Sequence, residues 1–262
     1  MQVKQLCAKK RRGFGKNRIN NFFAAAYNNG VDEITITQNG FDGLYMSYLF
    51  GRVKERFSFL PAEFAMQKEG EQTEIALKTE RAYCPYIRRF TEENLADVIA
   101  VGYKYAYFDK RLTLPLLSQT QRRLLITALV AADLPEDRAY ALRRFRGSDT
   151  YSLDGVYHFR LRELTKRWQD IVDYVPVDMG EASLNGFLEF LTEDGNGKLF
   201  VKGGKVYDEE YRRLTKSALT GKETPIGEIV LGQAERVYCF GETDRETALF
   251  LKKYYGEKAV FC

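Results

Sequence analysis

Short apolar runs separated by turn residues divide residues 1–90 into small elements. Weak alternation of apolar and polar side chains predicts a strand at Val3–Ala8, and the next apolar pattern predicts a helix at Asn17–Tyr27. β-Branched and aromatic residues on either side of a glycine-containing turn predict two more strands, Glu33–Thr37 and Leu44–Leu49. This part of the chain is therefore predicted to be a small β-α-β-β unit.

From residue 91 the apolar side chains recur at spacings of three and four, which is the period of a helix. The first helix is expected to begin at Thr91 as its N-cap. The apolar face of this helix would contain Leu95, Val98, Ile99, Gly102 and Ala106. Ser118 with Gln121, and Asp133 with Glu136, have the spacing of capping boxes and predict that two further helices begin there.

The longest apolar stripe runs from Ser152 to about Tyr174 and predicts one continuous helix. Its buried side would contain Leu153, Tyr157, Leu161, Leu164, Trp168, Ile171 and Val175. A fifth helix is predicted around Leu184–Leu191. Residues 91–192 are thus predicted to form a helical middle region.

After residue 192 the pattern returns to short strands. Lys198–Val201, Arg236–Phe240 and Lys258–Phe261 are predicted strands, and Thr243–Tyr254 is a predicted helix between the last two. A strand-helix-strand unit of this size normally pairs its strands in parallel. The predicted fold class is therefore α+β, or mixed α/β, with a C-terminal α/β unit at residues 193–262 following the helical middle.

Composition sets limits on the class of protein. With 262 residues and 45% apolar side chains, the chain can bury a sizeable core. Its start lacks an apolar secretory signal and no apolar run reaches about 20 residues, so we expect a cytoplasmic protein that does not enter a membrane. The four cysteines form no C-x-x-C pair, which predicts free thiols. The single histidine, His158, excludes a multi-histidine metal site, and no metal or other cofactor is predicted.

The net charge of +4 is unevenly distributed along the chain. Residues 1–18 contain seven basic residues and no acid, and residues 138–167 contain eight basic residues and three acids. Phe14 lies within the first group, so charge and an aromatic side chain occur together, as nucleic-acid contacts require. The candidate nucleic-acid-binding residues are Lys9, Lys10, Arg11, Arg12 and Lys16. Arg143, Arg144 and Arg146 would add to this surface only if folding places them on the same face.

Several segments resemble the YtxC family of sporulation proteins found in spore-forming Firmicutes. The central segment is Leu153-Asp154-Gly155-Val156-Tyr157-His158-Phe159-Arg160-Leu161-Arg162, which is similar to the Gly-Phe and Phe-Arg-Leu-Lys signature of that family. Asp170–Asp173, Gly186–Leu191, Gly227–Val237 and the closing Gly256–Cys262 extend the resemblance over roughly residues 90–262. It implies a cytoplasmic sporulation-associated protein with a possible protein partner, and it supplies no catalytic residues.

Other motifs have simple structural explanations. Gly13-Phe14-Gly15-Lys16 precedes a predicted helix but lacks the full spacing of a phosphate-binding loop. Asp208-Glu209-Glu210 fits the first turn of a helix, and Thr243 with Glu246 fits a capping box. His158 is expected to face solvent or to form a structural hydrogen bond.

Three functions remain open from the sequence. The first is a non-enzymatic interaction protein, and the second is a nucleic-acid-binding protein that uses the N-terminal basic turn. The third is a metal-dependent hydrolase or nuclease, which would need carboxylates such as Asp208 and Asp244 to converge at one pocket.

Overall fold

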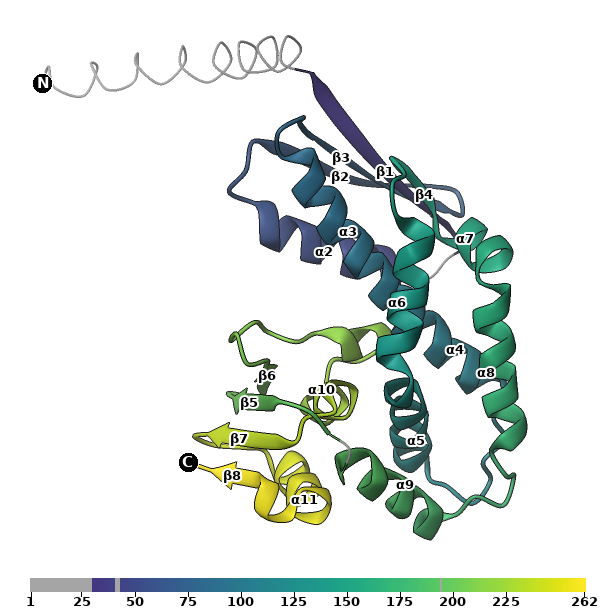
Figure 1. The fold of residues 1–262 in the computed structure, drawn as a ribbon, viewed down its shortest axis with the longest axis vertical. Helices are drawn as coiled ribbons and strands as arrows, with labels where there is room; N and C mark the ends of the chain where they lie inside the picture. The colour runs from purple at the N-terminus through teal and green to yellow at the C-terminus, as the bar shows by residue number, and fades with distance from the viewer. Residues whose placement is uncertain (1–29, 41–42, 194) are drawn as a thin grey trace, which may run out of the picture.

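A computed structural model describes residues 30–40, 43–193 and 195–262 of the chain. The predicted strand Val3–Ala8, the predicted helix Asn17–Tyr27 and the basic turn Lys9–Lys16 lie outside the described residues. The described residues form a mixed α/β fold, with one four-stranded sheet near each end and helices between them (Figure 1).

The N-terminal sheet has the strand order β2-β3-β1-β4. Its strands are β1 (Val31–Asn39), β2 (Ala62–Glu69), β3 (Gln72–Glu80) and β4 (Thr150–Ser152). β1 pairs antiparallel with β3 and parallel with β4, which follows more than 100 residues later in the chain. Alternate residues of β1, including Ile34 and Ile36, are buried, so the predicted strand Glu33–Thr37 is confirmed.

The predicted strand Leu44–Leu49 is wrong, because these residues begin the helix α2 (Leu44–Phe57). The buried side chains of α2 recur at spacings of three and four: Met46, Leu49, Val53 and Phe57. β2 and β3 then form a hairpin that the sequence reasoning missed, with Gly70 at φ +60° in its turn. Residues 31–80 form a β-α-β-β unit made of β1, α2, β2 and β3, of which only β1 belongs to the unit that the sequence predicted.

A long helical segment follows, made of α3 (Cys84–Asp97), the π-helical turn η1 (Val98–Tyr103) and α4 (Lys104–Arg111). It begins seven residues before Thr91, which is buried inside α3 and is not its N-cap. Leu95, Val98, Ile99 and Gly102 are buried as predicted, whereas Ala106 is exposed. A π turn has more residues per turn than an α-helix, so it changes which side chains of α4 face the core. Tyr105 and Phe108 are therefore buried in place of Ala106.

Helices α5 (Gln119–Ala132) and α6 (Leu134–Phe145) follow. The capping box of Ser118 and Gln121 is confirmed, with both of its hydrogen bonds present. Asp133 lies before α6 but makes no capping hydrogen bond, so the second predicted capping box is wrong. The Asp133 carboxylate instead accepts a hydrogen bond from Lys104 Nζ at 3.3 Å.

The predicted continuous helix from Ser152 to Tyr174 is two helices, α7 (Leu153–Arg160) and α8 (Arg162–Tyr174). Ser152 caps α7 by accepting a hydrogen bond from the backbone N–H of Gly155. The chain bends at Leu161, which has φ −113° and ψ 21°. The expected burial of Leu161, Leu164 and Trp168 is confirmed, and α9 (Glu181–Glu193) confirms the fifth helix.

The C-terminal sheet has the order β6-β5-β7-β8, in which β5, β7 and β8 are parallel and β6 is antiparallel. Its strands are β5 (Lys198–Lys202), β6 (Lys205–Tyr207), β7 (Arg236–Phe240) and β8 (Ala259–Phe261). The helical elements of this part are η2 (Lys216–Thr220), α10 (Pro225–Gly232), α11 (Arg245–Tyr254) and η3 (Gly256–Lys258). The three predicted strands and the parallel strand-helix-strand arrangement are confirmed.

Two details of this unit differ from expectation. α11 is capped by Asp244, whose carboxylate accepts from the N–H of Thr247 at 2.9 Å, and not by Thr243. Asp208–Glu210 forms a turn after β6, because the Asp208 carboxylate accepts from the N–H groups of Glu210 and Arg212. The Asp208 and Asp244 carboxylates therefore stabilise the backbone of the turn after β6 and of the first turn of α11.

Buried apolar side chains from both sheets and the helices between them form one continuous cluster. In the described part of the chain, no helix is both long and apolar enough to cross a membrane.

Candidate functional site

Arginine side chains from three consecutive helices line a hollow of about 590 Å³ on the surface of the helical region. We call it the arginine pocket. Its lining residues are Tyr140, Arg143, Arg144, Arg146, Phe159, Arg160, Arg162 and Glu163. The five arginines are exposed, so their guanidinium groups are open to a ligand in solvent.

The local fold explains why these arginines meet. Arg143 and Arg144 occupy the last turn of α6 and Arg160 the last turn of α7, where positive charge interacts favourably with the helix dipole. Residues two apart in an unbroken helix would point about 200° apart. The break at the buried Leu161 removes this constraint, and Arg160 and Arg162 both reach the same pocket.

Tyr140 organises the arginines of α6. Its hydroxyl accepts a hydrogen bond from Arg144 at 3.1 Å. The guanidinium carbons of Arg144, Arg143 and Arg167 lie 4.9, 5.8 and 5.5 Å from the centre of its ring. Such cation–π contacts hold positive side chains over an aromatic face. The Arg160 guanidinium is also held, because it donates to the backbone carbonyl of Arg144 at 3.3 Å.

Opposite charge is scarce in the arginine pocket. Glu163 is the one acid among its lining residues. Within the described part of the chain, none of the five pocket arginines forms an ion pair with a carboxylate. Neighbouring arginines behave differently, since Arg138 pairs with Asp97 at 2.7 Å and Arg167 with Asp137 at 3.3 Å. The pocket therefore keeps a net positive charge that an anionic ligand would neutralise.

An exposed aromatic side chain accompanies this charge. Phe159, at the end of α7, is 75% exposed and lines the arginine pocket beside Arg160. His158 is also exposed, but its ring packs edge-on against Tyr157 and does not line the pocket. The pocket thus presents guanidinium groups and aromatic surface without a histidine that could act as an acid or base there.

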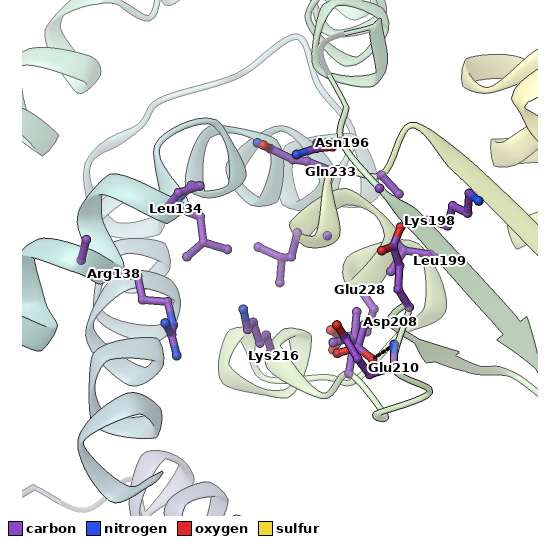
Figure 2. Close-up of a pocket in the computed structure, with 18 of the residues that line it drawn as sticks. Leu134, Arg138, Asn196, Lys198, Leu199, Asp208, Glu210, Lys216, Glu228 and Gln233 are labelled. Carbon is purple, nitrogen blue, oxygen red and sulfur yellow. Dashed lines mark hydrogen bonds between the residues drawn. The ribbon is translucent and has the colours of Figure 1, made fainter. Parts of the chain in front are cut away.

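A second hollow of about 590 Å³ lies between α6 and the C-terminal sheet (Figure 2). Arg138 and Lys216 approach it from one side and Asp208 and Glu210 from the other. Most of these charges are already paired, because Arg138 and Lys216 lie 2.7 and 3.7 Å from Asp97. Asp208 and Glu210 likewise pair with Arg212. This hollow therefore offers less uncompensated charge than the arginine pocket.

Glu228 is the buried acid of the second hollow. It is 2% exposed, and its Oε1 accepts from the backbone N–H of Ser217 at 2.6 Å. Its Oε2 has no hydrogen-bond partner among the described residues. Burial raises the pKa of the Glu228 carboxyl, and the hydrogen bonds from Ser217 only partly oppose this. A lone buried acid of this kind does not make a metal site.

The acids that a metal-dependent hydrolase would need are not brought together. Asp208 lines the hollow beside α6, whereas Asp244 lines a different one near Tyr105 and Phe250. Burial alone would raise the pKa of Asp244, but hydrogen bonds from Thr247 and from the backbone of Glu246 and Asp244 together outweigh it, and the pKa is lowered. Within residues 30–40, 43–193 and 195–262, no group of three acidic, thiol or imidazole side chains is placed to hold a metal ion. The convergence of Asp208 and Asp244 that a metal-dependent hydrolase would require is therefore not found, because the two acids line different hollows.

The sequence-predicted site residues have different outcomes. Lys9, Lys10, Arg11, Arg12 and Lys16 lie outside the described residues. Arg143, Arg144 and Arg146 do line one pocket together, which the sequence alone could not show. Cys84 and Cys239 are buried free thiols and Cys262 is an exposed one, while Cys7 is not among the described residues.

Arg160 and Arg162 are the pocket residues that sequence reasoning did not connect to Arg143. The excess of basic residues over residues 138–167 was a partial signal for them. No family model, curated protein or solved structure matches this chain. The resemblance to the YtxC family stays a prediction.

Proposed function

We propose that this protein binds nucleic acid through the arginine pocket and acts as a binding protein and not as an enzyme. The observation that carries the proposal is the meeting of five guanidinium groups, from α6 and the residue after it, α7 and α8, none of which pairs with a carboxylate of the described residues. Arginine is well suited to phosphate because its planar fork donates two parallel hydrogen bonds to phosphate oxygens. Phe159 and Tyr140 add aromatic surface beside these charges.

The basic N-terminal residues extend this proposal. Lys9, Lys10, Arg11, Arg12 and Lys16 would contribute further phosphate contacts, since a run of cations without acids attracts a polyanion wherever it is exposed. The resemblance to the YtxC family supports placing this binding in the cytoplasm of a sporulating cell. A protein partner in sporulation would then act together with the nucleic acid.

The experiment is binding of a fluorescently labelled 20-base-pair duplex at about 50 mM salt, followed by anisotropy. The test variant is Arg146→Ala/Arg162→Ala, because both side chains are exposed and neither forms a hydrogen bond or ion pair within the described residues. The control is Lys54→Ala/Arg56→Ala, which removes two exposed charges from α2. A third variant, Lys10→Ala/Arg11→Ala/Arg12→Ala, measures the N-terminal contribution.

We expect the pocket variant to lose roughly 10-fold in affinity for each arginine, as charge-assisted hydrogen bonds are worth about 1.5–3 kcal/mol. The control should bind like the wild type. Absence of binding by the wild-type protein, or equal binding by the wild type and the pocket variant, would refute the proposal. A loss confined to the N-terminal variant would move the site away from the arginine pocket.

A further inference from the structure

The C-terminal sheet has two chemically different faces. Leu199 and Val201 of β5, and Val237 and Cys239 of β7, are buried and join the core. The alternate residues of β5 and β7 point the other way, and each of them is exposed or half-buried. We call this second surface, together with the matching positions of β6 and β8, the outward face. Its residues are Lys198, Phe200, Lys202, Lys205, Tyr207, Arg236, Tyr238, Phe240 and Val260.

Aromatic rings form a stack across this outward face. The Phe200 ring centre lies 5.7 Å from that of Tyr238 and 6.2 Å from that of Phe240, with ring planes inclined by 29° and 28°. On its other side Phe200 stacks against Tyr211 at 4.8 Å and 11°. The result is a row of flat rings, at whose edges Tyr211 and Phe240 are exposed.

Tyr211 is held in place by an unusual backbone. Its φ of +57° lies in the left-handed region, which costs a non-glycine residue of order 1–3 kcal/mol. The Asp208 turn enforces this conformation, because the N–H of Tyr211 donates to the carbonyl of Asp208 at 3.0 Å. The side chain is nevertheless 67% exposed. The chain therefore uses a strained residue to hold an accessible tyrosine ring over Phe200.

Positive charges surround the rings. The outward face carries Lys198, Lys202, Lys205 and Arg236, and none of its positions is acidic. Figure 2 shows Lys198 directed away from the hollow beside α6, consistent with its place on the outward face. Arg236 is partly neutralised by Glu235, 3.7 Å away. The three lysines form no ion pair within the described part of the chain.

We infer that the outward face binds single-stranded nucleic acid by stacking bases on Tyr211 and Phe240 while the surrounding lysines neutralise phosphates. Exposed aromatic rings offer a surface for unpaired bases of any sequence, and basic side chains beside them follow the backbone. A duplex buries its base faces within its own stack, so it cannot use the rings. Neither interaction needs a 2′-hydroxyl, and RNA and DNA strands are both expected to bind. This inference rests on the proposed function and adds the strandedness of the ligand.

The experiment compares labelled 12-nucleotide oligouridine and oligothymidine with the 20-base-pair duplex, using the full chain and anisotropy at about 50 mM salt. The sheet variants are Tyr211→Ala, Phe240→Ala and the double variant, and Tyr211→Phe keeps the ring. Tyr174→Ala is the matched control, because Tyr174 is an exposed tyrosine on α8. Circular dichroism establishes that each variant is folded.

We expect each ring removal to weaken single-strand binding by roughly 5- to 150-fold. Tyr211→Phe and Tyr174→Ala should bind like the wild type, and duplex binding should not change. If the sheet variants bind single strands normally while Arg146→Ala/Arg162→Ala does not, the inference is overturned and the proposed function stands. If the sheet variants lose single strands but Arg146→Ala/Arg162→Ala binds the duplex like the wild type, the arginine pocket is the part that fails. If the wild-type protein binds none of the oligonucleotides, the inference and the proposed function are both overturned. Binding of peptides alone to the outward face would overturn them as well.

Discussion

Lys104 Nζ lies 2.8 Å from Oδ2 of Asp137, and the two side chains are only 0% and 2% exposed. The same oxygen accepts a hydrogen bond from the indole Nε1 of Trp168, also at 2.8 Å. A buried ion pair that carries an additional hydrogen bond joins α4, α6 and α8 at one point. Arg167 reaches the other Asp137 oxygen at 3.3 Å. Two of the helices that contribute to the arginine pocket, α6 and α8, are thus connected by buried polar contacts.

Lys104→Ala should therefore be costly. Removal of the ammonium group leaves the Asp137 carboxylate buried without its main partner, which typically costs about 3–5 kcal/mol of unfolding free energy. Urea unfolding measures this loss. Arg89→Ala removes an exposed i,i+4 pair with Glu93 and should cost no more than about 0.5 kcal/mol. Similar losses of unfolding free energy in the two variants would show that the buried pair contributes no more to stability than the exposed pair.

Trp168→Ala should also destabilise the protein strongly. The side chain is completely buried, and its ring contacts those of Tyr107 and Tyr157. Truncation of a large buried aromatic side chain typically costs about 3–5 kcal/mol. Tyr174→Ala, on the same helix but exposed, should stay within about 0.5 kcal/mol of the wild type. An unchanged denaturant midpoint for Trp168→Ala would mean that the buried face of α8 is wrongly assigned.

Gly102 occupies the π-helical turn where the ring of Tyr45 approaches the backbone. A Cβ at this position would lie 2.5 Å from Cε1 of Tyr45. We expect Gly102→Ala to cost about 1–3 kcal/mol by overpacking. Gly186, inside α9, has nothing within 4 Å of an added Cβ, so Gly186→Ala should stabilise the protein by up to about 1 kcal/mol. Thermal unfolding of the two variants should shift in opposite directions, and shifts of the same sign would contradict this account.

Glu228→Gln should stabilise the protein in a pH-dependent way. Burial raises the pKa of Glu228, so the folded carboxyl binds its proton more tightly than the unfolded one. Its contribution to stability is complete below the ordinary carboxyl pKa of about 4.3 and is lost as the pH rises through the folded pKa. Glutamine keeps the acceptor for Ser217 and carries no charge. The excess in unfolding free energy of Glu228→Gln over the wild type should grow as the pH rises through the folded pKa and then level off. An excess that is constant from pH 4 to 8 would show that the pKa of Glu228 is not raised.

The sequence predicted those elements whose pattern is long or flanked by clear boundaries. The strands at β1, β5 and β7 and the helix after Ser118 have such signals. The six residues Leu44–Leu49 were too short a window to distinguish the two periods, and the helical spacing becomes clear only when Val53 and Phe57 are included. Tyr105 and Phe108 are buried in place of Ala106 because of the π turn at Val98–Tyr103. No local sequence pattern predicts this turn.

The arginine pocket was predictable only in part. The local excess of basic residues around Arg143 is visible in the sequence, but the meeting with Arg162 depends on the helix break at Leu161. Similarly, the acidic residues Asp208 and Asp244 appear equally available for metal binding in the sequence. In the structure each accepts hydrogen bonds from backbone N–H groups a few residues along the chain, Asp208 in a turn and Asp244 at the start of α11, and the two line different hollows.

The most direct test of nucleic-acid binding at the arginine pocket is the salt dependence of duplex affinity between about 50 and 200 mM salt. Each phosphate that a side chain neutralises contributes about −0.9 to the slope of log affinity against log salt. We expect a steep negative slope for the wild type and a slope shallower by about two for Arg146→Ala/Arg162→Ala, while Lys54→Ala/Arg56→Ala keeps the wild-type slope. An identical slope for the pocket variant and the wild type would show that the phosphates are bound elsewhere and that the arginine pocket is not the nucleic-acid site.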